Sequence, residues 1–421
     1  MIPSHERPGL SWSGTVDYGP GPLHAPRSVP ELQSLVARRP RIRALGTRHS
    51  FSEVAASDAD LVTLAHLPEN IDIDTRARTA RVSAGLRYGV VAEAAHRAGL
   101  APRSMGSLPH ISVAGASATG THGSGNRNPV LAAAVREIEL VTADGDLLTL
   151  HRERDADVFG GSVLALGALG IITHLTLDLL PAYEVSQSVH LGLAPSALSP
   201  AGLEDVLAAG HSVSLFHHWD GTIAQAWVKR TDQPALPETW HGGQCAAGPV
   251  HPLPGLDPAP CTDQSGLPGP AHERLPHFRA AFTPSSGEEI QSEYFVAREH
   301  LSAAVAAVME LADRIRPILH ASELRTVAAD DLWLSPAHGR DSGCVHFTWR
   351  RRPREVAQLL PAIERALAPF APRPHWGKVF TLPAREVAAL YPRMTDVQAL
   401  RDRLDPRRVF TSAFVDGLLG S

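Results

Sequence analysis

The chain has 421 residues, of which 43% are hydrophobic and 20% are charged. This length suggests two domains, and the composition is that of a globular rather than a disordered protein. The net charge of −5 argues against a nucleic-acid partner, which would require a concentrated basic surface.

The cysteines and the apolar segments exclude several further classes of protein. The three cysteines, Cys245, Cys261 and Cys344, form no CxxC pair, which excludes a disulfide framework and a zinc ribbon. The N-terminal residues 1–6 show no signal-peptide pattern, and the most apolar stretch, 163–180, contains polar residues that make it a poor membrane span. We therefore expect a cytoplasmic protein with no membrane or protein partner.

The first 182 residues alternate short strands and helices. The pattern predicts strands at 42–45 and 80–83, a helix at 88–98 ended by Gly99, a hairpin at 137–150 around Asp144-Gly145, and a strand that begins after the glycine-rich run 167–172. No G-x-G-x-x-G follows any of these strands, so a Rossmann NAD site is not supported.

The second half contains an irregular region and then regular elements. Prolines recur between 234 and 276 and exclude long helices there. One apolar stripe (Leu301, Val305, Val308, Ala312, Ile315) predicts a helix that Pro317 ends. Strands follow at 318–327 and 344–349, then a helix at 356–367 interrupted by Pro361. This order predicts an α+β domain on an antiparallel sheet.

The heptapeptide Gly46-Thr47-Arg48-His49-Ser50-Phe51-Ser52 follows the first of these strands. A loop of small and hydroxylated residues can turn successive backbone N–H groups toward one point and cradle a pyrophosphate. A histidine inside such a cradle can reach the ring system of the bound nucleotide. A simple Gly/Ser turn with a solvated histidine explains the heptapeptide alone equally well.

A second segment, residues 104–125, consists almost wholly of small, uncharged residues. This composition suits close approach of the backbone to a large flat ligand. A flexible linker is the alternative, but linkers seldom contain residues such as Ile111, Val113 and two histidines.

Lysine occurs only at Lys229 and Lys378, and arginine supplies every other basic side chain. Lys378 lies in the run Pro374-His375-Trp376-Gly377-Lys378. A compact ammonium with a movable pKa can do chemistry that a guanidinium cannot, although two lysines are too few to exclude chance.

These segments resemble flavoproteins of the vanillyl-alcohol oxidase family. The heptapeptide resembles the loop that attaches FAD through histidine, and residues 104–125 are similar to the second flavin-contacting segment, most closely that of bacterial alditol oxidases. His-Trp-Gly-Lys is similar to a motif shared by sugar-lactone and alditol oxidoreductases. The resemblance extends over nearly the whole chain, but Ser412 stands where many relatives have asparagine.

The resemblance implies a two-domain fold with an FAD domain at 1–182, a substrate cap at 183–370 on an antiparallel sheet, and a segment at 371–421 that completes the site. It implies FAD bound covalently through His49 and oxidation of the terminal CH2OH of an alditol, such as xylitol, sorbitol or a glycerol-like polyol, by O2, which gives H2O2. An aldonolactone oxidase is the alternative within the family. A carbohydrate-binding or flavin-storage module without turnover is the alternative from another class.

The resemblance also implies the site residues. Those expected at the cofactor are Gly46, Thr47, Arg48, His49, Ser50, Phe51, Ser107, Ser112, Gly115, Ala116, Ser117, Thr119, Gly120, His122, Gly123, Ile171 and His375. Those expected at the substrate are Ser107, Glu323, Arg325, Thr348 and Lys378. Lys378 and Arg325 are the cations expected near developing alkoxide charge, and His346 is the expected general base.

Some of these assignments also agree with the local spacing. Glu323 and Arg325 lie two apart on a predicted strand, as do His346 and Thr348, so each pair shares one face. Taken singly, each pair is more often structural than functional, and a surface cross-strand ion pair would explain the first. No metal site is expected, because His272-Glu273-Arg274-Leu275-Pro276-His277 has the wrong spacing for H-E-x-x-H and His217-His218 would point to opposite faces of a strand.

Overall fold

The structure is a computed structural model that describes residues 8–282 and 287–420. The N-terminal residues 1–6, in which we expect no signal peptide, lie outside these ranges. Within the described ranges, no helix combines the length and the apolar character needed to cross a membrane.

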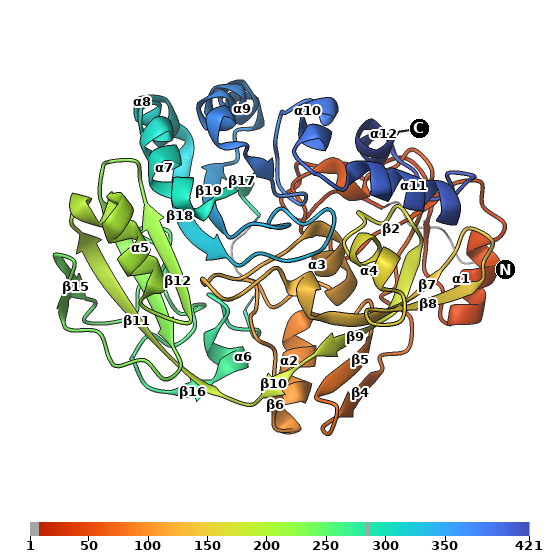
Figure 1. Cartoon of the computed structure of the whole chain (residues 1–421), viewed down its shortest axis with the longest axis horizontal. Helices are drawn as coiled ribbons and strands as arrows, with labels where there is room; N and C mark the ends of the chain where they lie inside the picture. Colours follow the sequence, from red (N-terminus) through yellow and green to blue (C-terminus); the bar gives the residue numbers. More distant parts are fainter. Residues whose placement is uncertain (1–7, 283–286, 421) are drawn as a thin grey trace.

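The described N-terminal part contains two larger sheets and one two-stranded sheet (Figure 1). Strands β1 (Leu23–His24), β3 (Asp60–Val62) and β2 (Ile42–Ala44) form a small parallel sheet. An antiparallel sheet has the order β4 (Ile71–Asp74), β5 (Thr79–Ser83), β9 (Ile171–Asp178), β7 (Val135–Val141) and β8 (Leu147–His151). The short strands β6 (Leu100–Ala101) and β10 (Leu180–Pro181) pair separately.

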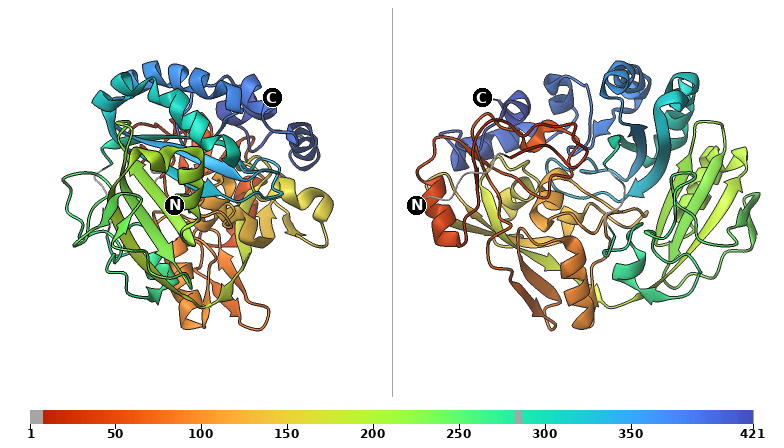
Figure 2. Two further views of the ribbon diagram at one scale, coloured as in Figure 1. Left: turned by 60° about the vertical axis from the view of Figure 1, so that its left-hand side comes forward. Right: turned by 180° about the vertical axis from the view of Figure 1, so that it is seen from behind.

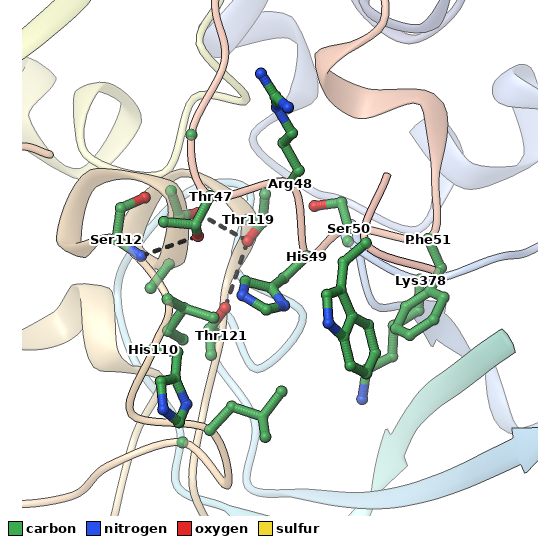
Figure 3. A pocket seen from close by; sticks show the side chains of 18 of the residues that line it. Thr47, Arg48, His49, Ser50, Phe51, His110, Ser112, Thr119, Thr121 and Lys378 are labelled. Atoms are coloured by element: carbon green, nitrogen blue, oxygen red, sulfur yellow. Dashed lines mark hydrogen bonds between the residues drawn. The ribbon is translucent and has the colours of Figure 1, made fainter. Parts of the chain in front are cut away.

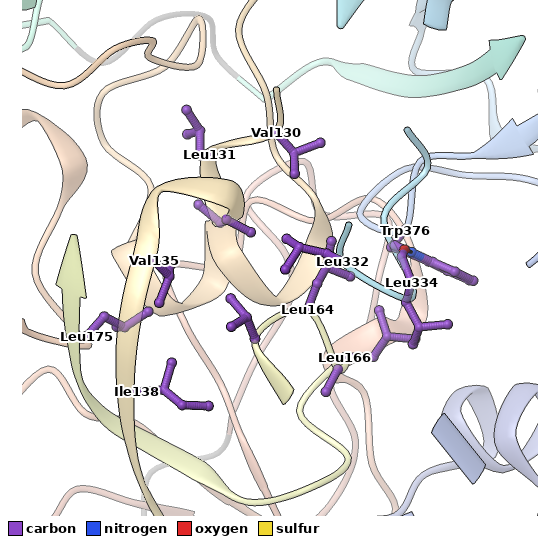
Figure 4. Packing of buried hydrophobic residues seen from close by; sticks show 14 of the residues in the cluster. Val130, Leu131, Val135, Ile138, Leu164, Leu166, Leu175, Leu332, Leu334 and Trp376 are labelled. Carbon is purple, nitrogen blue, oxygen red and sulfur yellow. Dashed lines mark hydrogen bonds between the residues drawn. The ribbon is translucent and has the colours of Figure 1, made fainter. Parts of the chain in front are cut away.

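Four helices pack around these sheets. They are α1 (Val29–Val36), α2 (Tyr88–Arg97), α3 (Val113–Thr119) and α4 (Ala156–Ser162). Figure 4 shows part of the apolar core, in which Ile138 and Leu175 of the sheet pack near Leu164. The predicted strands, the hairpin and the helix at 88–98 are confirmed, and Gly99 has the positive φ of +76° that favours glycine after a helix.

The second half forms one large antiparallel sheet, as predicted (Figure 1). Its order is β14 (Thr239–Trp240), β15 (Gly243–Cys245), β11 (Glu184–Leu193), β13 (Ile223–Arg230), β12 (Ser212–His217), β18 (Leu319–Val327), β19 (Ser342–Arg350), β17 (Glu289–Ala297) and β20 (Arg373–Pro374). Strand β16 (Gly269–Pro270) pairs with β11. The proline-rich region 234–276 contains only short strands and the single-turn helix α6 (Ala271–Arg274), as expected.

Helices cover one face of this sheet. They are α5 (Pro200–Ala208), α7 (Leu301–Met309), α8 (Ala312–Ile315) and α9 (Pro353–Leu367). Side chains alternate along the strands, so Leu324 and Val345 enter the core beneath the helices while Glu323 and His346 point to the opposite face. On this opposite face, α6 packs against β11 near Val185, while Glu323 of β18 and His346 of β19 are placed to build a polar site.

Two helix predictions need correction. The stripe from Leu301 to Ile315 is buried as predicted, but the backbone leaves the helical conformation at Leu311, so α7 and α8 are separate. Pro361 does not interrupt α9. Proline removes the hydrogen bond to the carbonyl of Ala357, and because Ala357 is exposed, water can replace that partner.

The C-terminal helices return to the N-terminal part (Figures 1 and 2). They are α10 (Ala384–Ala389), α11 (Met394–Leu404) and α12 (Ala413–Leu419). Val397 and Val415 belong to the N-terminal core, and the N–H of Ile42 donates to the carbonyl of Val409 at 2.8 Å. Short 3-10 turns complete the chain: Glu53–Ala55, Leu131–Ala134, Pro195–Leu198, Arg298–His300, Arg316–Ile318 and Ala368–Phe370.

Candidate active site

A cavity of about 700 Å³ lies between the N-terminal loops and the face of the large sheet opposite α5, α7, α8 and α9. Its lining includes the heptapeptide loop, the small-residue segment, strands β17, β18 and β19, and the segment that contains Lys378. Figure 3 shows His49 and Lys378 in this one pocket. The three segments that the sequence singled out therefore meet at one place.

The heptapeptide loop is fixed by its neighbours (Figure 3). The Oγ1 atom of Thr47 accepts a hydrogen bond from the N–H of Ser112 at 3.2 Å, just before α3. The N–H of Phe51 donates to the carbonyl of Gly377 at 2.7 Å. Arg48 has a φ of +64°, an uncommon conformation for a residue with a side chain. The loop thus connects the small-residue segment to the C-terminal segment.

His49 presents a neutral imidazole to the cavity. Burial lowers its pKa to about 4, helped by the nearby charges of His110 and Arg87. Its ring lies 5.6 Å from that of Trp12, and its Nδ1 atom has no hydrogen-bond partner in the described part of the chain. A buried nitrogen without a partner indicates that a ligand atom belongs beside it.

The small-residue segment leaves no room for larger side chains beside Ser112. A Cβ atom added at Gly115 would lie 2.7 Å from the Oγ of Ser112, and one added at Gly46 would lie 3.0 Å from it. The two loops therefore offer the cavity mostly backbone and small side chains. A flat ligand can approach such a surface closely.

The opposite wall of the cavity is a row of polar side chains across three strands. In the antiparallel register, His346 of β19 lies between Glu293 of β17 and Glu323 of β18. Gln291 and Thr348 form the next pair on the same face. The predicted pairing of side chains at i and i+2 on these strands is confirmed.

Two cations and two carboxylates form a buried cluster on this wall. The Nζ atom of Lys378 donates to Oε2 of Glu293 at 2.6 Å. An Nη atom of Arg325 lies 3.2 Å from Oε1 of Glu293 and 3.4 Å from Oε2 of Glu323. His122 contacts Glu293 at 3.2 Å. The two positive and two negative charges balance within the cluster.

The cluster shifts the pKa values of its members. Burial alone would raise the pKa of Glu293, but Lys378, Arg325 and His122 hold it well below its usual range. Burial lowers the pKa of Lys378, and Glu293 opposes this effect. Burial and the charge of Lys378 hold the pKa of His346 well below its usual range, so His346 is neutral at pH 7.

Most of the residues expected at the site line the cavity. Those at the cofactor side are Gly46, Thr47, Arg48, His49, Ser50, Phe51, Ser107, Ser112, Gly115, Ala116, Thr119, His122 and His375. Those on the polar wall are Glu323, Arg325, His346, Thr348 and Lys378.

Four expected cofactor residues do not line the cavity. Ile171 packs in a core with Val141, because strand alternation sends its neighbours Gly170 and Ile172 toward the cavity instead. Gly120 ends α3 with a φ of +71° and faces Leu164 and Pro336.

The other two are also set back from the lining. Ser117 lies on the fully buried face of α3. Gly123 permits a close approach to Ser104 and the carbonyl of Met105, where an added Cβ would come within 2.5 Å of that oxygen.

The polar residues of the site that the sequence did not indicate include Glu289, Gln291, Glu293 and His277. A signal existed for the first three, since they alternate with residues that enter the core. Ser412, by contrast, lies outside the cavity lining, and its side chain accepts from the N–H of Val415 to cap α12. The Ser412 hydroxyl therefore caps this helix and does not face the cavity.

The chain is similar to known flavin-binding proteins, as the geometry of the cavity leads one to expect. A family model described as an FAD binding domain matches residues 22–151, and one described as D-arabinono-1,4-lactone oxidase matches residues 285–418. An alditol oxidase from a Streptomyces species is 48% identical over 97% of this chain and 98% of that protein. The chain belongs to the alditol oxidase family.

Similarity extends to more distant proteins. An L-gulono-1,4-lactone dehydrogenase from Mycobacterium tuberculosis is 27% identical over 97% of this chain and 98% of that protein. A cholesterol oxidase from B. sterolicum has a TM-score of 0.78 at 14% identity, covering 100% of this chain and 99% of that one. A chitooligosaccharide oxidase has a TM-score of 0.77 at 13% identity, covering 96% and 93%. These structures show the vanillyl-alcohol-oxidase-type fold.

Membership of this family makes the protein an FAD-dependent oxidoreductase and removes the hypothesis of a module without turnover. The residues fit the cofactor: the backbone-lined loops suit a flat ring and a pyrophosphate, and His49 offers an unpartnered nitrogen. On the opposite wall, the polar row lies where a substrate can meet the ring.

Proposed function

We propose that the protein oxidises the terminal CH2OH of open-chain alditols, such as xylitol, sorbitol and glycerol-like polyols, to the aldehyde. Bound FAD would supply the redox chemistry, a two-electron oxidation of the carbinol carbon coupled to reduction of O2 to H2O2. The 48% identity to an alditol oxidase supports this substrate class.

The charge-balanced cluster is the observation on which the proposal rests. Two cations and two carboxylates cancel within the cluster, and Glu289 adds a further carboxylate to the wall. The wall therefore has no excess positive charge to attract a substrate carboxylate or phosphate. It offers instead many separate donors and acceptors. A site of this kind favours a neutral molecule with several hydroxyls, because a substrate that lacks them would leave buried polar groups unpaired.

Each residue of the wall has a role in the proposal. Lys378 and Arg325 stabilise the negative charge that develops on the reacting oxygen. The Nε2 atom of His346 lies 3.2 Å from the side-chain oxygen of Gln291, which assigns the ring proton to Nε2 and leaves a lone pair on Nδ1. That lone pair takes the hydroxyl proton, and Ser107, Glu323 and Thr348 bind the remaining hydroxyls.

We also propose that FAD is attached covalently through His49 alone. The neutral, unpartnered imidazole supports this, and none of the three cysteines lines the cavity. A yellow fluorescent band should survive denaturing electrophoresis in wild type and in the control His110→Ala, but not in His49→Ala. Release of the wild-type flavin by acid precipitation would disprove the linkage.

The predicted division of the chain into residues 1–182, 183–370 and 371–421 remains part of the proposal. It is supported by the change of sheet after β10 and by the return of α11 and α12 to the N-terminal core. A cytoplasmic location also stays a prediction, which fractionation of cells that express the protein would test.

The lactone-oxidase alternative has one observation in its favour, the match of residues 285–418 to the D-arabinono-1,4-lactone oxidase model. Peroxide release with xylitol and with gulonolactone separates the two functions. We expect rapid peroxide release and formation of an aldose with xylitol, and little turnover of the lactone. The reverse preference would overturn the alditol assignment.

A further inference from the structure

Lys229, the lysine other than Lys378, is buried but has no role in the proposed mechanism. It lies on β13 and is 1% exposed. Its Nζ atom donates to the carbonyl of Pro276 at 2.9 Å and to that of Leu275. Burial lowers the pKa of Lys229 to about 7. A buried ammonium that binds backbone carbonyls fixes the course of the segment that carries them.

Other contacts hold the same segment. The Oγ1 atom of Thr262 donates to the carbonyl of Pro276 at 2.8 Å, and Thr262 accepts in turn from Nε2 of Gln187 at 3.1 Å. The N–H of His277 donates to the carbonyl of Ser107 at 3.2 Å. The segment 275–277 is thus held between the large sheet and the small-residue segment.

This arrangement places the ring of His277 in the cavity wall. The ring packs edge-on against Trp227 at 5.2 Å and Phe216 at 5.6 Å, which leaves it little freedom to turn. Its Nε2 atom lies 3.9 Å from Oε1 of Glu323, and in the described residues that oxygen has no hydrogen-bond partner. This separation is too long for a hydrogen bond.

A hydroxyl oxygen can bridge the two atoms at normal hydrogen-bond distance from each. The hydroxyl would donate to the carboxylate oxygen and accept from the imidazole N–H. Burial and the charges of Lys229 and Arg325 hold the pKa of His277 well below its usual range, so the ring stays neutral. A neutral imidazole keeps one N–H, which can donate to the hydroxyl oxygen.

We propose that His277 is a further substrate-binding residue, which clamps one hydroxyl of the polyol together with Glu323, and that Lys229 is its positioning residue. The inference rests on the proposed function, because it assigns one more contact to the same substrate. It makes His277 a determinant of which carbons of the substrate must carry hydroxyls.

The test compares xylitol with analogues that each lack one non-terminal hydroxyl. Replacement of His277 with Phe should lower kcat/KM for xylitol on the order of tenfold, mainly through KM, because one buried hydrogen bond is lost. For the analogue that lacks the clamped hydroxyl, wild type should already be slow, and His277→Phe should change kcat/KM less than twofold. His277→Asn, which is smaller and keeps a polar group, should show the same selectivity if the Phe variant folds poorly.

Lys229→Met tests the positioning role. It should reproduce the selectivity of His277→Phe among the analogues, and the double variant should be no slower than His277→Phe alone. If Lys229→Met lowers only thermal stability, the positioning role is wrong. Equal loss on xylitol and on every analogue in the His277 variants would overturn the clamp. Absence of peroxide from wild type with every alditol would instead reject the proposed function itself.

Discussion

At the scale of single residues, the cluster around Glu293 determines the chemistry of the pocket. Glu293 is fully buried and contacts Lys378, Arg325 and His122. An uncompensated buried cation is costly, so this carboxylate allows both cations to remain charged beside the substrate. The sequence indicated the cations, but it did not indicate the residue that pairs them.

Lys378→Met should leave FAD bound and lower kcat/KM for xylitol on the order of a hundredfold, because a cation that stabilises developing charge in a dry site is lost. Lys378→Arg is the matched control. It keeps the charge and should retain more activity, although the larger guanidinium fits the site less well. Steady-state kinetics with xylitol measures both, and a loss below threefold in Lys378→Met would remove Lys378 from the mechanism.

Glu293→Gln should move the alkaline limb of kcat/KM to lower pH. The carboxylate of Glu293 raises the pKa of Lys378, so a neutral amide lets Lys378 lose its proton at lower pH. Because activity requires the ammonium, it should then decline earlier as pH rises, in a profile recorded from about pH 7 to 10.

Glu364→Gln is the control for this profile, since Glu364 is also buried but bonds to Tyr294 and Thr381 rather than to Lys378. Its alkaline limb should match that of wild type. An unchanged limb in Glu293→Gln would mean that Lys378 does not titrate in this range.

At the scale of elements, strand alternation explains which parts of the site the sequence could predict. Two residues of β18 at i and i+2 must share a face, so Glu323 and Arg325 were found together. Glu293 lies beside them only through the register of β17 on β19, which no local pattern specifies. The same alternation explains why Ile171, expected at the cofactor, lies in the core while its neighbour Ile172 lines the cavity. A shift of one residue along a strand moves a side chain to the opposite face.

The small-residue segment contains a glycine whose role can be tested. The backbone of Gly106 is not left-handed, and an added Cβ would lie 3.4 Å from Cγ2 of Thr121, which is ordinary contact. A tight turn therefore does not require this glycine. The resemblance to vanillyl-alcohol oxidases implies that it lies against the part of the flavin that reacts with O2.

Gly106→Val should therefore slow reoxidation by O2 and change anaerobic reduction by xylitol little. Stopped-flow absorbance follows the two half-reactions separately. Gly106→Ala is the conservative control and should have a smaller effect in the same direction. Equal slowing of both half-reactions would show that the glycine serves the fold or the substrate rather than oxygen access.

At the scale of the whole molecule, the site exists because segments far apart in the sequence meet. The antiparallel sheet, its strands β18 and β19 and the helical regions of α7 and α9 follow from local periodicity and were predicted, whereas β11, β12, β13, β17 and α5 were not. The break at Leu311 was not predicted, and the break predicted at Pro361 does not occur, because the backbone of Leu311 and the solvent exposure of Ala357 depend on tertiary packing. The return of α11 and α12 to the N-terminal core was expected only from the family resemblance.

Buried neutral histidines make the folded protein sensitive to acid. His217 is fully buried against Trp219, has no hydrogen-bond partner within the described ranges, and has a pKa lowered to about 3 by burial. Between about pH 3 and 6.5 the unfolded chain binds a proton at this residue and the folded chain does not, so stability falls as pH falls. At pH 5 the loss amounts to about 2 kcal/mol.

His217→Phe should remove this loss. The difference between the thermal midpoints at about pH 7.5 and pH 5 should shrink relative to wild type, because an apolar ring of similar shape has no proton to gain. Replacement of the exposed His66 with Asn is the control and should leave the difference unchanged. An equal pH dependence in wild type and His217→Phe would show that this histidine is not a source of acid sensitivity.

The absorption spectrum of the purified protein under anaerobic conditions tests the central claim most directly. Xylitol should bleach the flavin absorbance, and admission of O2 should restore it with one H2O2 and one aldose formed per flavin. Bleaching by gulonolactone but not by xylitol, or no bleaching by any alditol, would contradict the account.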